Sequence, residues 1–184
     1  MALKATVLRL SASLSDVDRC VYETLELTVA KHPSESLRYL SARVLAYLIH
    51  HAPGVAFSKG GLSNADEPPV LIRDDTGVMT HWIDVIAPSA DRLHRASKRC
   101  RVSVVTSVPD ALTREIKGQR IHRAETIDVA IVPDAFAQAL GGVIERGEPL
   151  SLSRSEGHLY ASAGAASFDA PLEVVSLEEL GSRG

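Results

Sequence analysis

Acidic residues on either side of one predicted β-turn are the strongest candidates in this sequence for a catalytic or metal-binding site. Residues 74–77, Asp-Asp-Thr-Gly, form a turn cluster between two runs that favour extended structure. A loop of these four residues pairs Arg73 with Val78 and, counted back along the ladder, Glu67 with Asp84. The hairpin then brings two carboxylates face to face.

Two opposed carboxylates repel each other, because directly opposed residues of an antiparallel pair have Cβ atoms roughly 4.5–5.5 Å apart. The repulsion can be offset by a divalent cation held by oxygen ligands, by a proton shared between the two groups, or by a nearby basic side chain. A loop shorter by two residues pairs Glu67 with Ile86 instead. The residues by themselves leave both registers and all three partners open.

Each candidate also has a purely structural interpretation. Acidic side chains are mostly exposed in proteins, so Glu67 and Asp84 can be two unrelated, solvated groups. A glutamate near the start of a helix, such as Glu35, is explained by the helix dipole alone. Trp82 lies two residues before Asp84 and therefore on the same face of the strand, where a core position is its simplest role.

The elements that must position these residues follow from the hydrophobic patterns. Residues 4–13 and 21–29 alternate like the two strands of a hairpin, joined through the intervening Ser-Asp-Val-Asp. A helix follows, with Ser34 as its cap and Glu35 in its first turn, and its apolar stripe continues to His51. Glycines then break the pattern before the central hairpin.

Downstream, strands and helices alternate. We predict a helix opening at Pro88-Ser89, a strand over 102–108, a helix over 109–119, a strand over 126–132, a helix from Pro133 to Gly141-Gly142, and strands over 150–154, 158–161 and 172–175. Residues 161–167 are predicted to form a loop, and the chain beyond Leu180 a frayed end. This order favours an α/β or α+β domain with a mixed sheet and flanking helices.

Composition and charge narrow the class of protein. The chain has 184 residues, of which 45% are hydrophobic and 23% charged, as expected for one globular domain rather than a disordered chain. No apolar run is long enough to cross a bilayer and no signal segment is evident, so we expect a cytoplasmic protein without membrane contact. The net charge of −3 means that any nucleic-acid contact has to be local.

Four short motifs resemble those of bacterial YaeQ proteins. They are the N-terminal Met-Ala-Leu-Lys-Ala-Thr, the helix start at residues 32–35, the Asp-Glu-Pro element at residues 66–68, and Trp-Ile-Asp at residues 82–84 ahead of Pro88. The resemblance extends over nearly the whole chain, so we expect a single YaeQ-like domain over residues 1–184.

The resemblance implies a PD-(D/E)XK nuclease-like core with extra N-terminal and C-terminal strands. In that pattern Asp66 or Glu67 takes the first acidic position, Asp84 the second, and Glu35 that of an accessory acid, and together they would hold Mg²⁺ or Mn²⁺. The lysine of the pattern is missing, since Ile86 stands two residues beyond Asp84.

A cation beside the metal stabilises developing negative charge during phosphodiester hydrolysis, and isoleucine cannot supply one. The helix after residue 88 offers replacements, Arg95 or Lys98 above all, with Arg92 and Arg99 close by. By default these residues are the solvent-facing side of an amphipathic helix.

Two functional hypotheses from different classes follow. The first is a divalent-metal-dependent nuclease or related phosphodiesterase that uses Glu67, Asp84 and Arg95 or Lys98. The second is a non-catalytic binding or regulatory protein on the same scaffold, in contact with nucleic acid through the local basic helix face. The missing lysine and the mildly acidic charge favour the second hypothesis.

Overall fold

The computed structural model describes residues 5–58 and 67–183 of the chain. The fold divides into two compact units, each made of two separate stretches of sequence. Unit 1 comprises Met1–Ser41 and Val132–Leu172, and unit 2 comprises Ala42–Ile131 and Glu173–Gly184. Each unit holds one mixed sheet and flanking helices, which confirms the predicted mixed α+β class. The nuclease-like core implied by the resemblance stays a prediction. The single-domain organisation stays a prediction.

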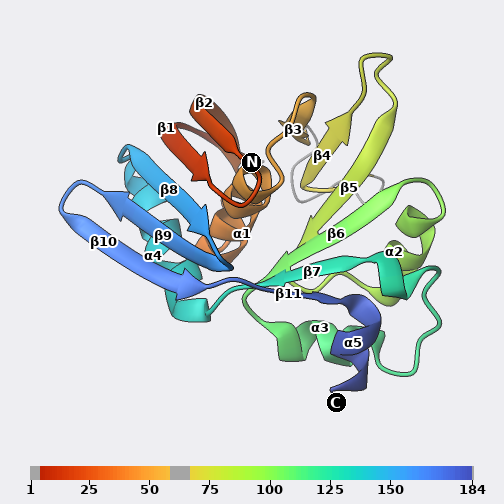
Figure 1. Ribbon diagram of the computed structural model, residues 1–184. Helices are drawn as coiled ribbons and strands as arrows, with labels where there is room; N and C mark the ends of the chain where they lie inside the picture. The colour runs from red at the N-terminus through yellow and green to blue at the C-terminus, as the bar shows by residue number, and fades with distance from the viewer. Residues whose placement is uncertain (1–4, 59–66, 184) are drawn as a thin grey trace. The chain divides into compact units, whose positions relative to one another are not determined.

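Unit 1 is built on a five-stranded sheet in the order β10-β9-β8-β1-β2. Its strands are β1 (Thr6–Asp16), β2 (Val21–Lys31), β8 (Leu150–Ser155), β9 (His158–Ala163) and β10 (Ala166–Pro171). The predicted N-terminal hairpin is confirmed, with Thr6 paired to Lys31 and Asp16 to Val21. β1 also pairs in parallel with β8, which makes the sheet mixed (Figure 1).

The first strand is longer than predicted because a buried carboxylate is neutralised from elsewhere in the chain. The sequence pattern assigns Asp16 to the turn, but its side chain is fully buried at the end of β1. Arg19 Nε lies 2.6 Å from Asp16 Oδ2, and Arg154 of β8 approaches the same oxygen at 3.6 Å. Because Arg154 is distant in sequence from Asp16, no local sequence pattern indicates that the two residues pair.

The helix of unit 1, α4 (Asp134–Arg146), continues through the glycine pair at which the sequence predicts its end. It ends at Gly147, whose φ of 68° suits a left-handed cap. Gly141 has a packing role instead, since a Cβ at this position would lie 2.7 Å from the carbonyl oxygen of Leu37. The helix packs on the sheet partly through Phe136, which meets Phe168 of β10 at 5.2 Å between ring centroids.

The loop predicted over residues 161–167 is wrong. β9 and β10 form a tight antiparallel hairpin in which Ala163 pairs with Ala166. Small residues alternate between buried and exposed positions along β9, and Ala161 and Ala163 are both buried. A strand whose inward side chains are mostly alanine gives a weak hydrophobic period, so the sequence pattern underestimates it.

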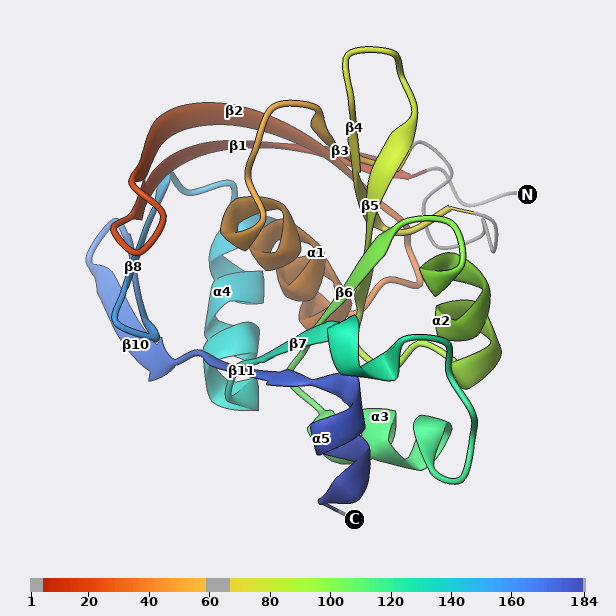
Figure 2. The same cartoon turned by 45° about the vertical axis from the view of Figure 1, so that its right-hand side comes forward.

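Unit 2 is built on a six-stranded sheet in the order β11-β7-β6-β5-β4-β3. Its strands are β3 (Val55–Phe57), β4 (Val70–Arg73), β5 (Met79–Val85), β6 (Arg101–Thr106), β7 (Asp128–Ile131) and β11 (Glu173–Ser176). β5, β6 and β7 run parallel, whereas β3, β4 and β11 are antiparallel to their neighbours (Figure 2). The short strand β3 was not predicted.

Helices α2 (Ala90–Ser97), α3 (Pro109–Ile116) and α5 (Leu177–Ser182) cover one face of this sheet. Their buried side chains share one hydrophobic cluster with the strands, made of Trp82, Leu93, Ala96, Val102, Val104, Leu112, Ile116, Ile127, Val129, Leu177 and Leu180. α5 begins with a capping box between Ser176 and Glu179. The prediction that the chain frays beyond Leu180 is therefore wrong.

Helix α1 (Leu37–Ile49) starts two residues later than the sequence predicts. The cap is Ser36, whose Oγ accepts a hydrogen bond from the backbone N–H of Tyr39 at 3.2 Å. Ser34 and Glu35 therefore precede the helix. The Glu35 carboxylate turns back and accepts the backbone N–H of His32 at 3.1 Å, so a position in the first helical turn does not explain it.

Among the described residues, no helix is both long and apolar enough to cross a membrane.

Candidate functional site

Strand β5 carries the second acidic residue of the predicted site in an almost fully buried environment. The strand is flanked by β4 and β6, and every residue from His81 to Val85 is buried. Asp84 is only 4% exposed. A carboxylate in such a position needs a partner for its charge, because an isolated buried charge is very costly.

The paired residues of the central hairpin follow the alternative register, which differs by two residues from the one that pairs Glu67 with Asp84. Val70 pairs with Ile83, where the predicted four-residue loop would pair it with His81. Asp74 causes part of the difference, because its Oδ1 accepts the backbone N–H groups of Thr76 and Val78 and so extends the loop to Val78. A bulge beside Arg73 supplies the rest. The expected cross-strand pair of Glu67 and Asp84 is therefore not formed, since Glu67 lies before β4.

The turn bonds also stabilise the ionised form of Asp74. The hydroxyl of Thr76 donates to Asp74 Oδ1 at 2.6 Å, and this bond is the largest cause of a lowered Asp74 pKa. Asp74 is thus an organiser of the turn.

Arg92 of α2 is the partner of Asp84. Its Nε donates to Asp84 Oδ2 at 2.5 Å, and the indole Nε1 of Trp82 donates to the same oxygen at 2.8 Å. The Arg92 guanidinium also lies over the Trp82 ring, 4.8 Å from its centroid. Trp82 and Asp84 share one face of β5, and that face is turned toward α2. A cation–π contact and two charge-assisted hydrogen bonds thus fix the carboxylate.

The two acidic positions are connected through Arg92 rather than directly. Arg92 Nη2 donates to the main-chain carbonyl of Glu67 at 2.8 Å. The Glu67 carboxylate itself accepts the hydroxyl of Ser58 at 2.9 Å and lies 3.9 Å from Nη2 of Arg73. The Glu67 side chain is therefore engaged at the start of the hairpin.

The two other predicted ligands are Asp66 and Glu35. Asp66 lies outside the described residues. Glu35 belongs to unit 1, where it is 5% exposed and bonded to His32, whereas Asp84 belongs to unit 2.

Ile86, at the position where the nuclease pattern has lysine, adopts an unusual backbone conformation. Its φ is 68°, a value that β-branched residues rarely adopt. Its backbone N–H donates to the carbonyl of Val105 at 2.8 Å, which holds the chain at the end of β5. A lysine side chain at this position would therefore point in a different direction from one on an extended residue.

The basic residues predicted to replace the lysine do not act as one face. Arg92 is directed inward to Asp84, whereas Arg95 is exposed and pairs with Asp91 at 3.1 Å. Lys98 and Arg99 lie beyond α2, where they line a separate cavity. Of these four residues, only Arg92 touches the predicted acidic residues in the described structure.

The described residues do not form a ready set of ligands for a divalent metal. Over residues 5–58 and 67–183, no group of three or more His, Cys, Asp and Glu side chains is arranged to hold a metal ion. Mg²⁺ and Mn²⁺ require several oxygen ligands. Asp84 Oδ2 already accepts two strong hydrogen bonds, one of them from a cation.

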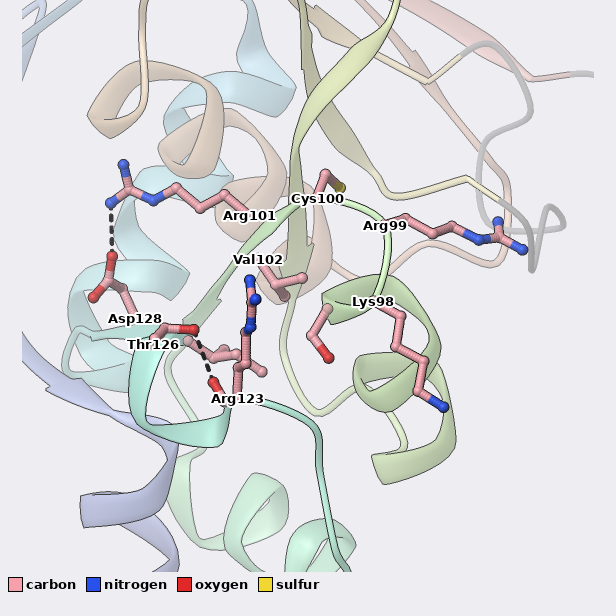
Figure 3. Close-up of a pocket in the computed structure, with 10 residues that line it drawn as sticks. Lys98, Arg99, Cys100, Arg101, Val102, Arg123, Thr126 and Asp128 are labelled. Carbon is pink, nitrogen blue, oxygen red and sulfur yellow. Dashed lines mark hydrogen bonds and ion pairs between the residues drawn. The ribbon is translucent and has the colours of Figure 1, made fainter.

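A basic cavity of about 560 Å³ is the second notable feature of unit 2. It lies where α2 leads into β6 and beside the start of β7, and it is lined by Ser97, Lys98, Arg99, Cys100, Arg101, Val102, Arg123, Thr126, Ile127 and Asp128 (Figure 3). Sequence reasoning noted Lys98 and Arg99 but missed Arg101 and Arg123. The run Lys-Arg-Cys-Arg from residue 98 was the available signal.

Cys100, in the wall of this cavity, is half-buried and free. Burial is the main cause of its raised pKa. Its thiol therefore stays neutral near pH 7, which argues against a nucleophilic role.

Comparison with known proteins identifies the family. The model of the family described as YaeQ protein matches residues 1–171 of this chain. The chain belongs to the YaeQ family. Curated YaeQ relatives from Escherichia coli K12, Shigella flexneri and Salmonella typhi are each described as uncharacterized, and each is 34% identical over 96 residues. That match covers 52% of this chain and 52% of each relative.

Two solved YaeQ structures extend the similarity over nearly the full length. The YaeQ protein of Pseudomonas syringae is 29% identical with a TM-score of 0.79, covering 94% of this chain and 96% of that one. The YaeQ protein of Xanthomonas axonopodis pv. citri is 30% identical with a TM-score of 0.77, covering 93% and 98%. This YaeQ chain therefore shares the fold of its solved relatives.

Proposed function

We propose that this YaeQ protein is a non-catalytic binding or regulatory protein, in which Asp84 orients a cation of α2 instead of holding a metal. The observation that carries the proposal is the 2.5 Å ion pair between Asp84 and Arg92. Both side chains are largely shielded, with 6% of Asp84 and 19% of Arg92 exposed.

The chemistry of hydrolysis explains why this pair matters. A metal-dependent nuclease needs carboxylate oxygens that are available to hold the cation that activates water and polarises the phosphate. Arginine is protonated at every physiological pH, so Arg92 satisfies the Asp84 charge permanently and cannot act as a general base. Ile86 adds no charge where the nuclease pattern has its lysine.

A metal-dependent phosphodiesterase is the second candidate, and one observation favours it. Arg92 contacts both the carboxylate of Asp84 and the carbonyl of Glu67, so the two positions implied by the family pattern share one cation. If Arg92 moved aside, Mg²⁺ or Mn²⁺ could meet oxygen ligands there. Asp66 would be the additional acid implied by that pattern.

Activity and stability measurements separate the two candidates. Purified protein would be incubated with single- and double-stranded DNA and RNA in the presence of Mg²⁺ or Mn²⁺, next to the Asp84→Ala variant. We expect no cleavage by either protein and no change of melting temperature with either metal. Cleavage that depends on metal and disappears in folded Asp84→Ala would replace the proposed function with the second candidate.

The cytoplasm is the compartment that we propose for this binding protein. Both cysteines, Cys20 and Cys100, are free thiols, as is usual for proteins in a reducing compartment. Thiol-specific labelling of the protein in intact cells would check this proposal. Protection by a disulfide would contradict it.

A further inference from the structure

We propose that the basic cavity at the junction of α2 and β6 binds the phosphate group of a small phosphorylated molecule. This inference goes beyond the proposed function, because the cavity lies apart from Asp84 and its role holds whether or not the protein hydrolyses anything.

The charges around the cavity are strongly one-sided. Its lining contains four cationic residues, Lys98, Arg99, Arg101 and Arg123, and one acidic residue, Asp128. Arg101 Nη2 pairs with Asp128 at 2.8 Å, which accounts for one cation and the only acid of the lining. Lys98, Arg99 and Arg123 have no acidic partner among the described residues. The chain as a whole has a net charge of −3, so the lining of this cavity is a positively charged region on an acidic protein.

Arg123 is the cation aimed across the cavity. Figure 3 shows its side chain extending toward Val102, while Lys98 and Arg99 extend outward from the opposite side. Its φ is 52°, in the left-handed region that non-glycine residues seldom occupy. The backbone N–H and the hydroxyl of Thr126 both donate to the Arg123 carbonyl at 2.9 Å, which holds this conformation. A maintained backbone strain of this kind is typical of ligand sites.

The shape of the cavity favours a small ligand over a nucleic acid. Its volume of about 560 Å³ falls within the range of roughly 300–1,000 Å³ that is typical of small-molecule pockets. Val102 and Ile127, 2% and 1% exposed, close its base against the hydrophobic core. The cations of the lining come from two chain segments and do not follow an extended track, as contacts to a nucleic-acid backbone would. Arginine can bind phosphate through two parallel hydrogen bonds, and lysine contributes as a point charge.

Thermal unfolding with inorganic phosphate tests the proposal directly. Wild-type protein, Arg123→Gln and Arg99→Glu would be melted in potassium phosphate and in potassium chloride of equal ionic strength. The matched control is Arg114→Gln, which removes one positive charge from an exposed position of helix α3, away from the cavity lining. We expect phosphate to stabilise the wild type and Arg114→Gln equally, because a ligand bound to the native state raises apparent stability.

In Arg123→Gln the phosphate affinity should fall by about tenfold or more, since this variant loses a charge-assisted contact. Arg99→Glu should also weaken binding, because it reverses a charge beside the cavity. Equal phosphate effects in all four proteins, or none in any, would overturn the proposal. So would a twelve-nucleotide single strand that binds through Arg123 and is not displaced by phosphate, because the ligand would then be nucleic acid.

Protection of Cys100 gives a second, independent measurement. In a Cys20→Ser background, phosphate should slow the alkylation of Cys100 by neutral iodoacetamide, since Cys100 belongs to the lining of the cavity. The protection should be lost in Arg123→Gln. Unchanged alkylation of Cys100 at a phosphate concentration that stabilises the protein would place the phosphate elsewhere and refute the assignment.

Discussion

Arg92 Nε lies 2.5 Å from the same Asp84 oxygen that accepts the indole N–H of Trp82. The contact joins the centre of the sheet of unit 2 to helix α2, and it gives a buried carboxylate a permanent positive neighbour. Asp84 therefore has a structural role that does not require any ligand. This role can be measured by comparing the pair with an exposed pair on the same helix.

Removing the Asp84 charge should destabilise the protein far more than removing that of Asp91. Asp84→Asn removes the carboxylate that pairs with the largely buried guanidinium of Arg92, and breaking such a pair costs about 3–5 kcal/mol. Asp91 pairs with Arg95 in an exposed contact at 3.1 Å, where a loss of about 0.2–1 kcal/mol is expected for Asp91→Asn. Urea unfolding of both variants would measure the difference. Equal losses would show that Asp84 has no structural role.

Replacing both members of the buried pair should cost less than replacing one. In Asp84→Asn/Arg92→Met no buried charge remains unpaired, so we expect the double variant to regain part of the lost stability. A double-mutant cycle from the same urea curves gives the coupling energy, which should be at least about 1 kcal/mol for residues in contact. Additive losses would mean that the two side chains act independently.

Removing Arg92 should expose any hidden metal site. Arg92→Ala leaves the Asp84 carboxylate and the Glu67 carbonyl without their shared donor. We expect Mn²⁺ to stabilise neither the wild type nor this variant, because too few oxygen ligands of the described residues meet there. The assay is sensitive, since a metal at about 100 times its Kd would add about 2.7 kcal/mol. Stabilisation of Arg92→Ala by Mn²⁺ would favour the nuclease candidate.

His81 should make the stability depend on pH between about 4 and 6.5. It is 7% exposed on β5, and burial is the main cause that lowers its pKa to about 4, with Arg101 adding to the shift and Asp128 opposing it. Its Nε2 lies 2.9 Å from Ser103 Oγ, and its ring meets His50 at 5.2 Å.

The sign follows from proton binding. As the pH falls below about 6.5, the unfolded chain takes up a proton at His81 before the folded protein does, so the free energy of unfolding decreases until the pH reaches about 4. The loss is on the order of 3 kcal/mol. Guanidinium unfolding at several pH values would measure this loss. In His81→Gln the free energy of unfolding should decrease less steeply between pH 6.5 and about 4. An identical slope in the variant would contradict the assignment.

Alanine substitutions at two adjacent glycines of α4 should change the stability of the protein in opposite directions. A Cβ at Gly141 would lie 2.7 Å from the Leu37 carbonyl oxygen, so Gly141→Ala should lose about 1–3 kcal/mol through overpacking. At Gly142 the nearest atom is a terminal nitrogen of Arg146 at 3.4 Å. Gly142→Ala should therefore gain up to about 1 kcal/mol of helix propensity. Thermal unfolding of the two variants would check both directions.

Local patterns were sufficient to predict most of the helices and strands. Alternation located the hairpin of β1 and β2, and the pair Pro88-Ser89 located the start of α2, because both signals lie within a few residues. Patterns failed where the inward side chains are small, as along β9, or where a buried residue depends on a distant partner. Asp16 is the clearest case, since its charge is balanced partly by Arg154.

The sequence by itself determined the family, the fold class and the presence of acidic residues around the central turn. Only the tertiary structure decided what those residues contact. The loop held by Asp74 and the bulge beside Arg73 shift the register, and a shift in a hairpin changes every cross-strand neighbour. The pairing of Asp84 with Arg92 and the gathering of Arg123 with Lys98 join residues from separate elements. Such contacts depend on how helices pack on a sheet, and no local spacing encodes that packing.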